Sequence, residues 1–445
     1  MPLFFSVEKH RRALSLALLG LAALAGLVRV VQQPPPAPFE TPSAPALKET
    51  VSGAPQTHFV SLEAGPHRHA PSLVELRDGR LRAFWFSGSR EGAADVVIRS
   101  AVFDPRSSRW STETTVVDRQ QTQSGLLRYV KKLGNAVAIR DDDGRLQLFY
   151  VTVSLGGWAG SSITRIVSTD DGASWSAPQR LVTSPFLNVS TLVKGAPFRY
   201  ADGMIGLPVY HEFIGKFAEI LRLDDAGRLL DKQRLTHGRH SLQPVVLVRD
   251  GERAQVLMRH AGKGPSRVVG VETADGGRSW SAPHSLPLAN PNAAVSGLTL
   301  PDGTLLAVLN DIESNRDALS LVASGDGGQS WKTLEMLEDQ RGLRGRSLAV
   351  PAYRQSLGIL GRAADPALDA ASAAGLDAFA AGALKPMCVD ETRCDFEFSY
   401  PYLALTAQGS VHLVYTWNRS YIRHRVFPLE WLSQRMQEVA DGRAG

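Results

Sequence analysis

The chain has 445 residues, of which 43% are hydrophobic and 21% are charged. This balance allows a sizeable core, excludes a disordered chain and argues against a polytopic membrane protein. Lys and Arg number 49 against 44 Asp and Glu, a net charge of +5 that is compatible with acidic ligands but too weak to predict nucleic-acid binding. The two cysteines exclude a Cys-rich zinc fold and a disulfide framework.

Residues 1–31 are predicted to be an uncleaved signal anchor or a cleaved signal peptide, with a buried helix as the third alternative. Lys9 and Arg12 precede an apolar stretch from Ala13 to Val28, which orients such a segment with its N-terminus in the cytoplasm. The stretch is short for a membrane span, and "ALAG" from Ala23 is an A-x-A-like cleavage site. We expect an exported protein, anchored in inner-membrane lipid at the periplasmic face, or periplasmic or secreted after cleavage.

The body of the chain, residues 57–427, contains a repeated unit, and residues 32–56 before it are rich in Pro, Ala and Gln and predict an extended tether. The unit is a two-residue turn followed by a strand-like run, a strong hairpin signal when the turn is Asp-Gly. Copies begin at Asp78, Asp143, Asp202, Asp250, Asp302 and Gln408. Six units at roughly 50-residue spacing predict an all-β, six-bladed β-propeller.

A second repeat, S/T-x-D-x-G-x-S-W, supports the same fold. Copies occupy Ser168–Trp175, Thr273–Trp280 and Ser324–Trp331, and they start 105 and 51 residues apart. The Asp can accept hydrogen bonds from turn amides, the Gly allows a positive φ, and the Trp can pack between blades. We therefore expect these motifs on outer turns, away from the central pocket, and their Asp residues not to be catalytic.

The spacing before the last unit is enlarged by an Ala-rich segment. Residues 363–386 predict one or two short helices inserted in a loop, and residues 428–445 predict a C-terminal amphipathic helix and tail. Cys388 and Cys394 are predicted to form a disulfide in an oxidising compartment. No spacing of His or acidic residues predicts a metal site, and no organic cofactor is implied.

These Asp boxes on a predicted propeller resemble the sialidase (neuraminidase) superfamily, and the chain is similar to the bacterial BNR-repeat family of predicted neuraminidases. The resemblance covers about residues 65–427. It implies an exported glycoside hydrolase that releases a terminal acidic sugar, sialic acid or a related one, from a glycan or glycoconjugate.

The resemblance implies a carboxylate clamp made of three arginines, because guanidinium groups pair bidentately with carboxylates. Arg259 ends a strand before an Asp box, and Arg316 lies just before the next box, so both match family positions. The third position, in "HRHAPSL", is occupied by His69, with Arg68 one residue earlier. Strand alternation would turn Arg68 to the opposite face.

The resemblance also implies a tyrosine nucleophile paired with a glutamate. Tyr400 in "EFSYPYLAL" matches the tyrosine, and such a phenol, whose pKa is ordinarily near 10, needs a basic partner. The partner position holds Gln243, and an amide cannot act as a base. Glu212 and Glu397 are the alternatives.

The family's acid/base carboxylate lies in the loop "WFSGSREGAADVVI", where Glu91 and Asp95 are the candidates. Asn135, Asn292 and Arg419 lie at predicted blade entrances and are expected to line the pocket. In the implied mechanism the arginines bind the carboxylate, the acid protonates the leaving oxygen, and the tyrosine attacks or stabilises the oxocarbenium-like centre.

Two other functions stay open. The departures at Gln243 and His69 favour a glycosidase or lyase for uronic-acid polysaccharide on the same propeller. Because a fold does not fix a chemistry, a non-catalytic glycan-binding or envelope-assembly propeller is the alternative from another class.

Overall fold

The computed structural model describes residues 3–31, 35–41, 53–63, 65–184, 188–238, 240–343, 348–390 and 392–443. The chain forms two compact units, Met1–Ala37 and Pro38–Gly445. The first contains helix α1 (Leu3–Val31). In the described part of the chain, no helix has both the length and the apolar character needed to cross a membrane. Export and lipid contact stay predictions.

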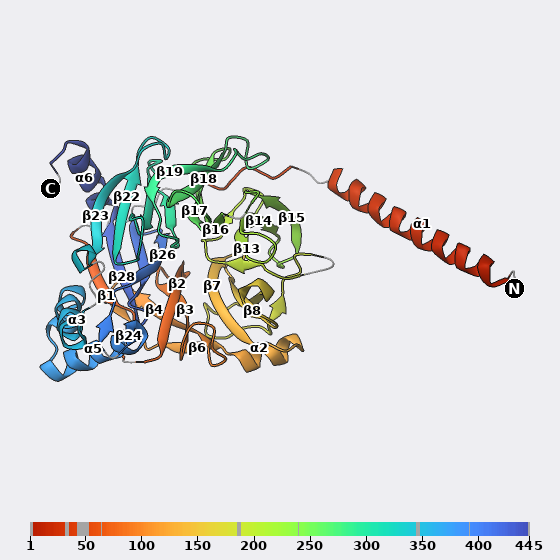
Figure 1. Cartoon of the computed structure of the whole chain (residues 1–445). Helices are drawn as coiled ribbons and strands as arrows, with labels where there is room; N and C mark the ends of the chain where they lie inside the picture. Colours follow the sequence, from red (N-terminus) through yellow and green to blue (C-terminus); the bar gives the residue numbers. More distant parts are fainter. Residues whose placement is uncertain are drawn as a thin grey trace. The chain divides into compact units, whose positions relative to one another are not determined.

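The second unit consists of six antiparallel sheets around a common centre, which confirms the predicted all-β, six-bladed propeller (Figure 1). Blade 1, from the innermost strand outward, contains β2 (His67–Glu75), β3 (Leu81–Gly88), β4 (Val97–Asp104), β5 (Arg109–Trp110) and β6 (Thr114–Val117). Blade 2 contains β7 (Lys132–Arg140), β8 (Leu146–Val153), β9 (Ser161–Ser168) and β10 (Gln179–Arg180). Blade 3 contains β11 (Leu192–Val193), β12 (Phe198–Arg199), β13 (Ile205–His211), β14 (Phe217–Leu223) and β15 (Leu229–Arg234).

The remaining blades follow the same order, and the sixth is completed by a strand from the beginning of the body. Blade 4 contains β16 (Ser241–Val248), β17 (Ala254–His260), β18 (Arg267–Thr273) and β19 (His284–Ala289). Blade 5 contains β20 (Ser296–Thr299), β21 (Leu305–Leu309), β22 (Ala318–Ser324) and β23 (Lys332–Asp339). Blade 6 contains β26 (Phe398–Leu405), β27 (Ser410–Trp417), β28 (Tyr421–Pro428) and β1 (Gln56–Phe59). The pairing of β1 with β28 closes the ring.

Strands in the middle of the blades are buried on both sides because each blade packs against two neighbours. β8 and β21 are buried along their whole length. β21 is a continuous apolar run, which is typical of strands buried on both faces, whereas β8 also contains Gln147 and Thr152.

The propeller has two faces with different connections. The turns between first and second strands, which include Asp78–Gly79 and Asp250–Gly251, lie on one face, which we call the turn face. The loops between second and third strands lie on the other, with the connections from blade to blade, because antiparallel strands reverse direction. This cavity face carries residues 89–96, 154–160, 212–216, 261–266, 310–317 and 418–420.

The Asp boxes form closed turns between third and fourth strands, on the turn face, as predicted. In the second box, Ser279 donates to Asp275 through its backbone N (2.9 Å) and its Oγ (2.6 Å), and Thr273 Oγ1 donates to Asp275 (2.8 Å). These bonds, led by the Ser279 hydroxyl, lower the pKa of Asp275 to about 2. Its lone pairs are used within the turn, which gives the motif a structural role.

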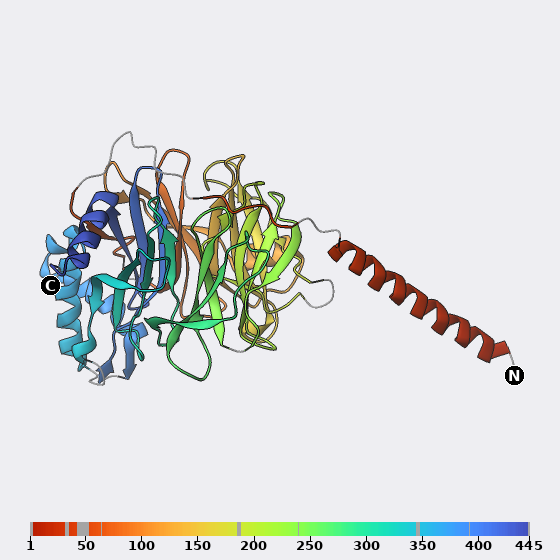
Figure 2. The same ribbon diagram turned by 90° about the horizontal axis from the view of Figure 1, so that it is seen from above.

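Helices cover the edge of the propeller near the last blade (Figure 2). The insertion contains α3 (Val350–Ala364), α4 (Pro366–Asp369) and α5 (Ala373–Met387), and α6 (Leu429–Ala440) follows the last blade. The helices begin at Val350 instead of the predicted 363, because Tyr353, Leu357 and Ala364 form a buried stripe at helical spacing. A disulfide joins Cys388 and Cys394, which lie in β24 (Cys388–Asp390) and β25 (Arg393–Cys394). Other short helical elements are α2 (Arg119–Leu126) and 3-10 turns at Trp158–Gly160 and Arg341–Leu343.

Candidate active site

Bulges in the innermost strands turn side chains into the centre of the propeller. β2, β16 and β26 each shift register near their first residues. At these bulges Ala70, Gln243 and Tyr400 have φ of 53°, 53° and 54°, and each precedes a proline. A bulge re-aims a side chain, and left-handed backbone at a residue other than glycine is costly and gathers at functional sites.

The centre of the cavity face contains a cavity of about 150 Å³. Its lining combines polar groups from several blades with aromatic side chains. The lining residues are Glu91, Asn135, Val151, Trp158, Leu192, Tyr210, Glu212, Gln243, Arg259 and Tyr400. Six of these were candidates from the sequence, and Trp158 and Tyr210 were not.

Tyr400 lies in the floor of the cavity, where its phenol oxygen accepts two hydrogen bonds. Gln243 Nε2 donates to Tyr400 Oη at 3.4 Å, and Arg259 Nη1 donates to it at 3.5 Å. Arg259 Nη1 also donates to Gln243 Oε1 at 3.2 Å, so the three side chains form a triangle. The amide of Gln243 thus orients Tyr400 and Arg259.

Three guanidinium groups are joined beside the cavity, and we call Arg259, Arg316 and Arg419 the arginine arc. Arg259 Nε donates to Asn292 Oδ1 (2.7 Å), and Arg316 Nη2 donates to Asn292 O (2.9 Å). Glu397 then accepts from Arg316 Nη1 (3.2 Å) and from Arg419 Nε (2.7 Å). Such a row of cations is suited to a planar anion.

Both carboxylate oxygens of Glu397 accept hydrogen bonds from arginines of the arc, so Glu397 does not serve as a base for Tyr400. Burial acts to raise its pKa, but Arg419, Arg316 and the Ser399 hydroxyl lower it further, so the pKa of Glu397 lies below its usual range. Ser399 Oγ donates to Glu397 Oε1 at 2.7 Å. The carboxylate therefore stays ionised and positions two arginines.

Arg68, one of the predicted clamp residues, lies outside the cavity. It is 2% exposed, its Nη2 is 2.8 Å from Glu113 Oε1, and its Nη1 donates to Ser420 O at 3.1 Å. Its charge is already paired with Glu113, and it is not among the residues that line the cavity, so the structure does not bring Arg68 to the other clamp candidates. In the arc, Arg419 supplies the third guanidinium.

His69 is buried against Tyr400, with ring centroids 4.3 Å apart. Burial, followed by His67 and nearby cations, lowers the pKa of His69 well below its usual value. The imidazole is therefore neutral, and it serves as a packing surface for the tyrosine.

Two carboxylic acids, Glu91 and Glu212, line the side of the cavity formed by blades 1 to 3. Burial raises the pKa of Glu212, although Arg259 opposes the shift. Lys132 lies close to both acids, and its Nζ is 3.7 Å from the centroid of the Trp158 ring. The raised pKa favours the protonated form of Glu212, which a proton donor needs.

Asp95, the other acid predicted in this region, is not part of the cavity lining. It accepts from Ser89 N (2.9 Å) and Ser89 Oγ (3.0 Å) and so holds its own loop together. In the described part of the chain, no group of three or more His, Cys, Asp or Glu is placed to hold a metal ion.

Lys194 lies under the cavity floor and was not singled out in the sequence. Its Nζ donates to Pro401 O at 2.9 Å and is 5.9 Å from the centroid of the Tyr400 ring. Burial lowers the pKa of Lys194 to about 7. A single lysine in "LVKGAPF" carries no pattern that distinguishes it from a surface lysine.

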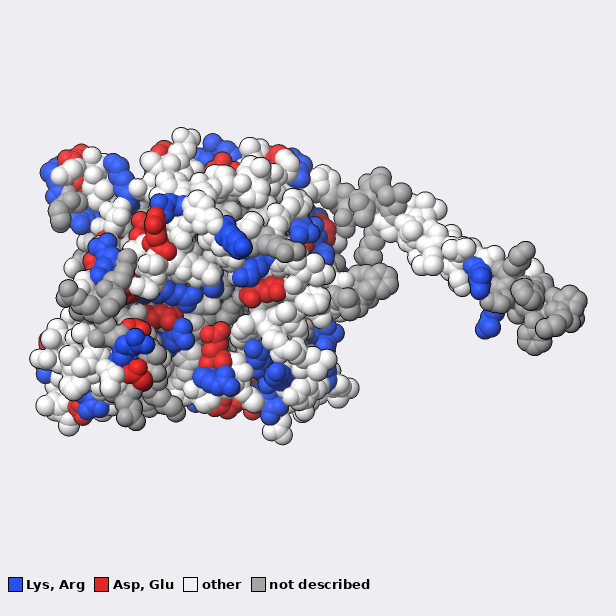
Figure 3. Space-filling view, viewed as in Figure 1, with Lys and Arg blue, Asp and Glu red and all other residues white. Residues whose placement is uncertain are grey.

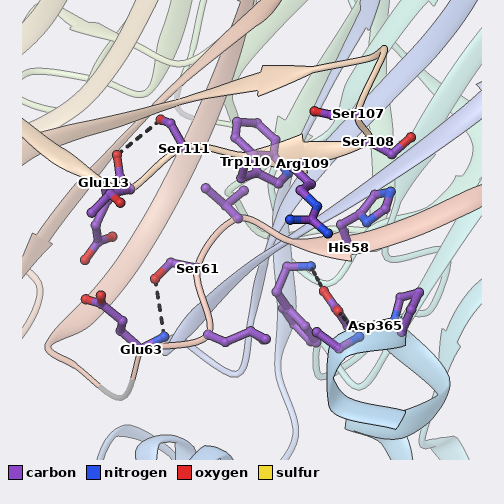
Figure 4. Close-up of a pocket in the computed structure, with 16 residues that line it drawn as sticks. His58, Ser61, Glu63, Ser107, Ser108, Arg109, Trp110, Ser111, Glu113 and Asp365 are labelled. Atoms are coloured by element: carbon purple, nitrogen blue, oxygen red, sulfur yellow. Dashed lines mark hydrogen bonds between the residues drawn. The ribbon is translucent and has the colours of Figure 1, made fainter. Parts of the chain in front are cut away.

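A larger hollow of about 950 Å³ lies at the seam between β1, the β5–β6 region and α4 (Figure 4). Two of its carboxylates are already engaged. Glu113 is paired with Arg68 and with Arg99 (3.3 Å), and Asp365 accepts from Phe59 N (2.7 Å) and Ala367 N (2.8 Å). The central cavity has two acids beside three cations and a phenol, so we place the candidate site there.

Charges of both signs are interspersed over the visible face of the molecule (Figure 3). This distribution agrees with the small net charge of +5. No large patch of a single sign is visible on this face that would by itself attract an anion.

Comparison with known proteins identifies the fold. The profile of the family described as "BNR repeat-like domain" matches residues 79–413. No curated protein matches the chain. Similar solved structures include the Hadza microbial sialidase Hz136, with 16% identity and a TM-score of 0.58 over 82% of this chain and 66% of that one, so this chain spans just under two thirds of that sialidase.

Two further solved structures are matched over almost their whole length. The intramolecular trans-sialidase from Ruminococcus gnavus has 12% identity and a TM-score of 0.55 over 82% of this chain and 95% of that one. A protein of unknown function from Dyadobacter fermentans has 13% identity and a TM-score of 0.54 over 85% and 98%. Identities this low establish a shared fold only.

Proposed function

Because the chain belongs to the BNR repeat-like domain family, we propose that its central cavity is the active site of a glycoside hydrolase that releases a terminal acidic sugar, sialic acid or a related one, from a glycan. The observation that carries the proposal is the arginine arc, three guanidiniums joined through Asn292 and Glu397 beside the cavity. Pairing with a sugar carboxylate would hold the substrate in one orientation.

In the proposed reaction, Glu212 gives its proton to the leaving oxygen as the glycosidic C–O bond breaks. Burial raises the pKa of Glu212 and so favours its protonated form, which supports the role of general acid. Glu91, which lines the same wall, is the alternative donor. Tyr400 stabilises the oxocarbenium-like centre, and water adds to that centre, supplying the hydroxyl of the released sugar and the proton that restores the acid. Alternatively, Tyr400 attacks the centre and its phenol proton passes to Glu91, which lines the same cavity. Water then cleaves the sugar–tyrosine bond, its hydroxyl going to the sugar and its proton to the phenol, and the proton on Glu91 restores Glu212.

The test is hydrolysis of a fluorogenic sialic acid α-glycoside by the full chain, with Tyr400→Phe and Arg316→Ala alongside. We expect the wild type to release the fluorophore. Tyr400→Phe is expected to lose this release while still binding the ligand, and Arg316→Ala is expected to have a higher KM. A panel of uronic-acid glycosides forms the second arm, because Gln243 and His69 depart from the family pattern. A folded wild type that cleaves no acidic-sugar glycoside in either arm would rule out the hydrolase.

A second function, glycan binding without turnover, is favoured by one specific observation. Both hydrogen bonds at Tyr400 Oη are donated to it, by Gln243 and Arg259, so neither partner is a base. Calorimetry with a sialylated trisaccharide distinguishes the two functions. Binding by the wild type without turnover, unchanged in Glu212→Gln, would support the binding function.

We also propose that residues 1–31 direct export. The support is the basic start and the apolar run in the sequence. Cell fractionation with N-terminal sequencing of the mature protein tests this proposal. An intact N-terminus in the cytoplasmic fraction would contradict it.

A further inference from the structure

Within the described part of the propeller unit, most exposed large apolar side chains lie in loops and connections of the cavity face at blades 2 and 3. Six residues are exposed there, with Leu127 at 93%, Ile214 at 81% and Leu155 at 75%. We call these six the apolar rim: Leu127, Tyr129, Leu155, Val182, Phe213 and Ile214.

The connectivity places all six in loops or connections of the cavity face. Leu155 lies in the β8–β9 loop, and Phe213 and Ile214 lie in the β13–β14 loop. The other three lie in the connections from β6 to β7 and from β10 to β11, which end on the same face. The two loops also contain Trp158 and Glu212, which line the cavity itself.

Scattered apolar residues on a surface are ordinary, so the clustering must carry the inference. The other exposed large apolar residues of the described body are Leu230, Met336 and Ile359, which lie on outer strands or on α3. The described loops between the second and third strands of blades 4 to 6 carry none, and Ile359 lies on α3 in the helical insertion between blades 5 and 6. One sector of the cavity mouth is therefore apolar, and the sector with the arginine arc is not.

Two lysines lie close to rim residues, and an exposed arginine lies next to a cavity acid. Lys131 Nζ donates to Gly156 O (3.2 Å) beside Leu155, and Lys216 lies two residues after Ile214. Arg90 is exposed next to Glu91. Apolar side chains among Lys and Arg suit an amphiphile with hydrocarbon and an anionic head group.

The cavity of about 150 Å³ admits only the end of a glycan, so the rest of the substrate must pass over its mouth. We propose that the apolar rim binds the hydrocarbon part of a lipid-linked acidic glycoconjugate, whose terminal sugar enters the cavity. This inference rests on the proposed binding of an acidic sugar in the cavity, and it adds the substrate class.

The test compares two α-glycosides of sialic acid that differ only in the aglycone, methyl or octyl, below the micellar concentration. With the full chain, calorimetry is expected to show about tenfold tighter binding of the octyl glycoside. The variant Leu155→Ser/Phe213→Ser/Ile214→Ser is expected to lose this gain and to bind the methyl glycoside as the wild type does. The matched control Leu230→Ser/Ile359→Ser removes exposed apolar side chains elsewhere and is expected to keep the gain.

The outcomes separate the two proposals. If the wild type binds the methyl and octyl glycosides equally well, the proposed role of the apolar rim is wrong, while the proposed carboxylate site is unaffected. A gain that survives the triple variant also overturns the role of the rim. If the wild type does not bind the methyl glycoside, the proposed acidic-sugar site is wrong. If it nevertheless binds the octyl glycoside tightly, and the triple variant does not, the apolar rim is a site for hydrocarbon alone.

Discussion

Glu397 holds two of the three guanidiniums in the arginine arc while it is itself 8% exposed. Its role is positioning, because it acts on a ligand only through Arg316 and Arg419. A carboxylate in this place fixes the arginine geometry before any substrate arrives, which lowers the entropic cost of binding.

We expect Glu397→Gln to weaken binding of a carboxylate-bearing sugar about tenfold, because both arginines lose a charged partner. The free energy of unfolding should fall by about 1–3 kcal/mol. Calorimetry and urea unfolding measure the two effects. The matched control is Glu113→Gln, which breaks the Arg68 pair outside the cavity and should lower stability without changing the affinity.

Lys194 provides a pH signature of the cavity floor. Its folded pKa of about 7 lies below the unfolded value of 10.5, so the unfolded chain binds more protons between these pH values. Stability of the wild type therefore rises with pH over this window, and the full cost of the buried charge is present below about pH 7.

Replacing Lys194 by methionine should remove this rise of stability with pH. Unfolding midpoints in urea at pH 6.5 and at about pH 9.5 are expected to differ less in Lys194→Met than in the wild type. The stabilising effect of the substitution should be largest at the lower pH. An unchanged slope in the variant would show that Lys194 is charged in the folded protein across the window.

The candidate site was partly predictable at this scale. Arg259, Arg316 and Tyr400 were located from motifs, because each has a fixed place relative to a strand end or an Asp box. The position of Arg419 in the arc depends on the β27–β28 turn, where Asn418 and Arg419 have φ of 49° and 53°. No local pattern specifies that its partner is Glu397, which lies 22 residues away.

At the scale of elements, the hairpins and the Asp boxes were predictable because turn chemistry is local. The start of α3 was not predictable, since its buried stripe of Tyr353, Leu357 and Ala364 is sparse. The helix also contains Gly358 and Gly361, which weaken the helical signal of the sequence. The bulges before Pro71, Pro244 and Pro401 were also missed, although a proline in an inner strand is itself a signal for a bulge.

The Asp boxes should affect stability without affecting the site. Asp275→Ala removes the acceptor for Ser279 and Thr273, and we expect the Tm to fall by about 1–3 °C with glycan affinity unchanged. Differential scanning calorimetry measures the change. Asp302→Ala in an Asp-Gly turn, where the carboxylate accepts one backbone bond, should have a smaller effect.

At the scale of the whole molecule, closure of the ring depends on β1. Phe59 in β1 is 4% exposed and packs against Trp417, Phe379 and Tyr421, with ring centroids 5.3–5.7 Å apart. It therefore joins the first strand of the body to the last blade and to the inserted helices. Pairing between distant parts of the sequence gave no local signal, whereas the number of blades followed from the repeats.

We expect Phe59→Ala to lower the free energy of unfolding by about 3–5 kcal/mol, because a buried ring is replaced by a cavity at the closure. Chemical denaturation followed by circular dichroism measures the loss. Phe213→Ala, at an exposed position, is the size-matched control and should leave stability unchanged. Similar losses in both variants would contradict the importance of the closure.

The segment that precedes β1 is docked on the propeller. Phe39 stacks on Tyr200 at 5.5 Å, Phe39 N donates to Gly251 O (2.8 Å), and Ala201 N donates to Pro38 O (2.8 Å). These partners lie in turns of blades 3 and 4, on the turn face. The contacts of Pro38 and Phe39 therefore occupy the turn face, and they leave the approach to the cavity on the opposite face unobstructed.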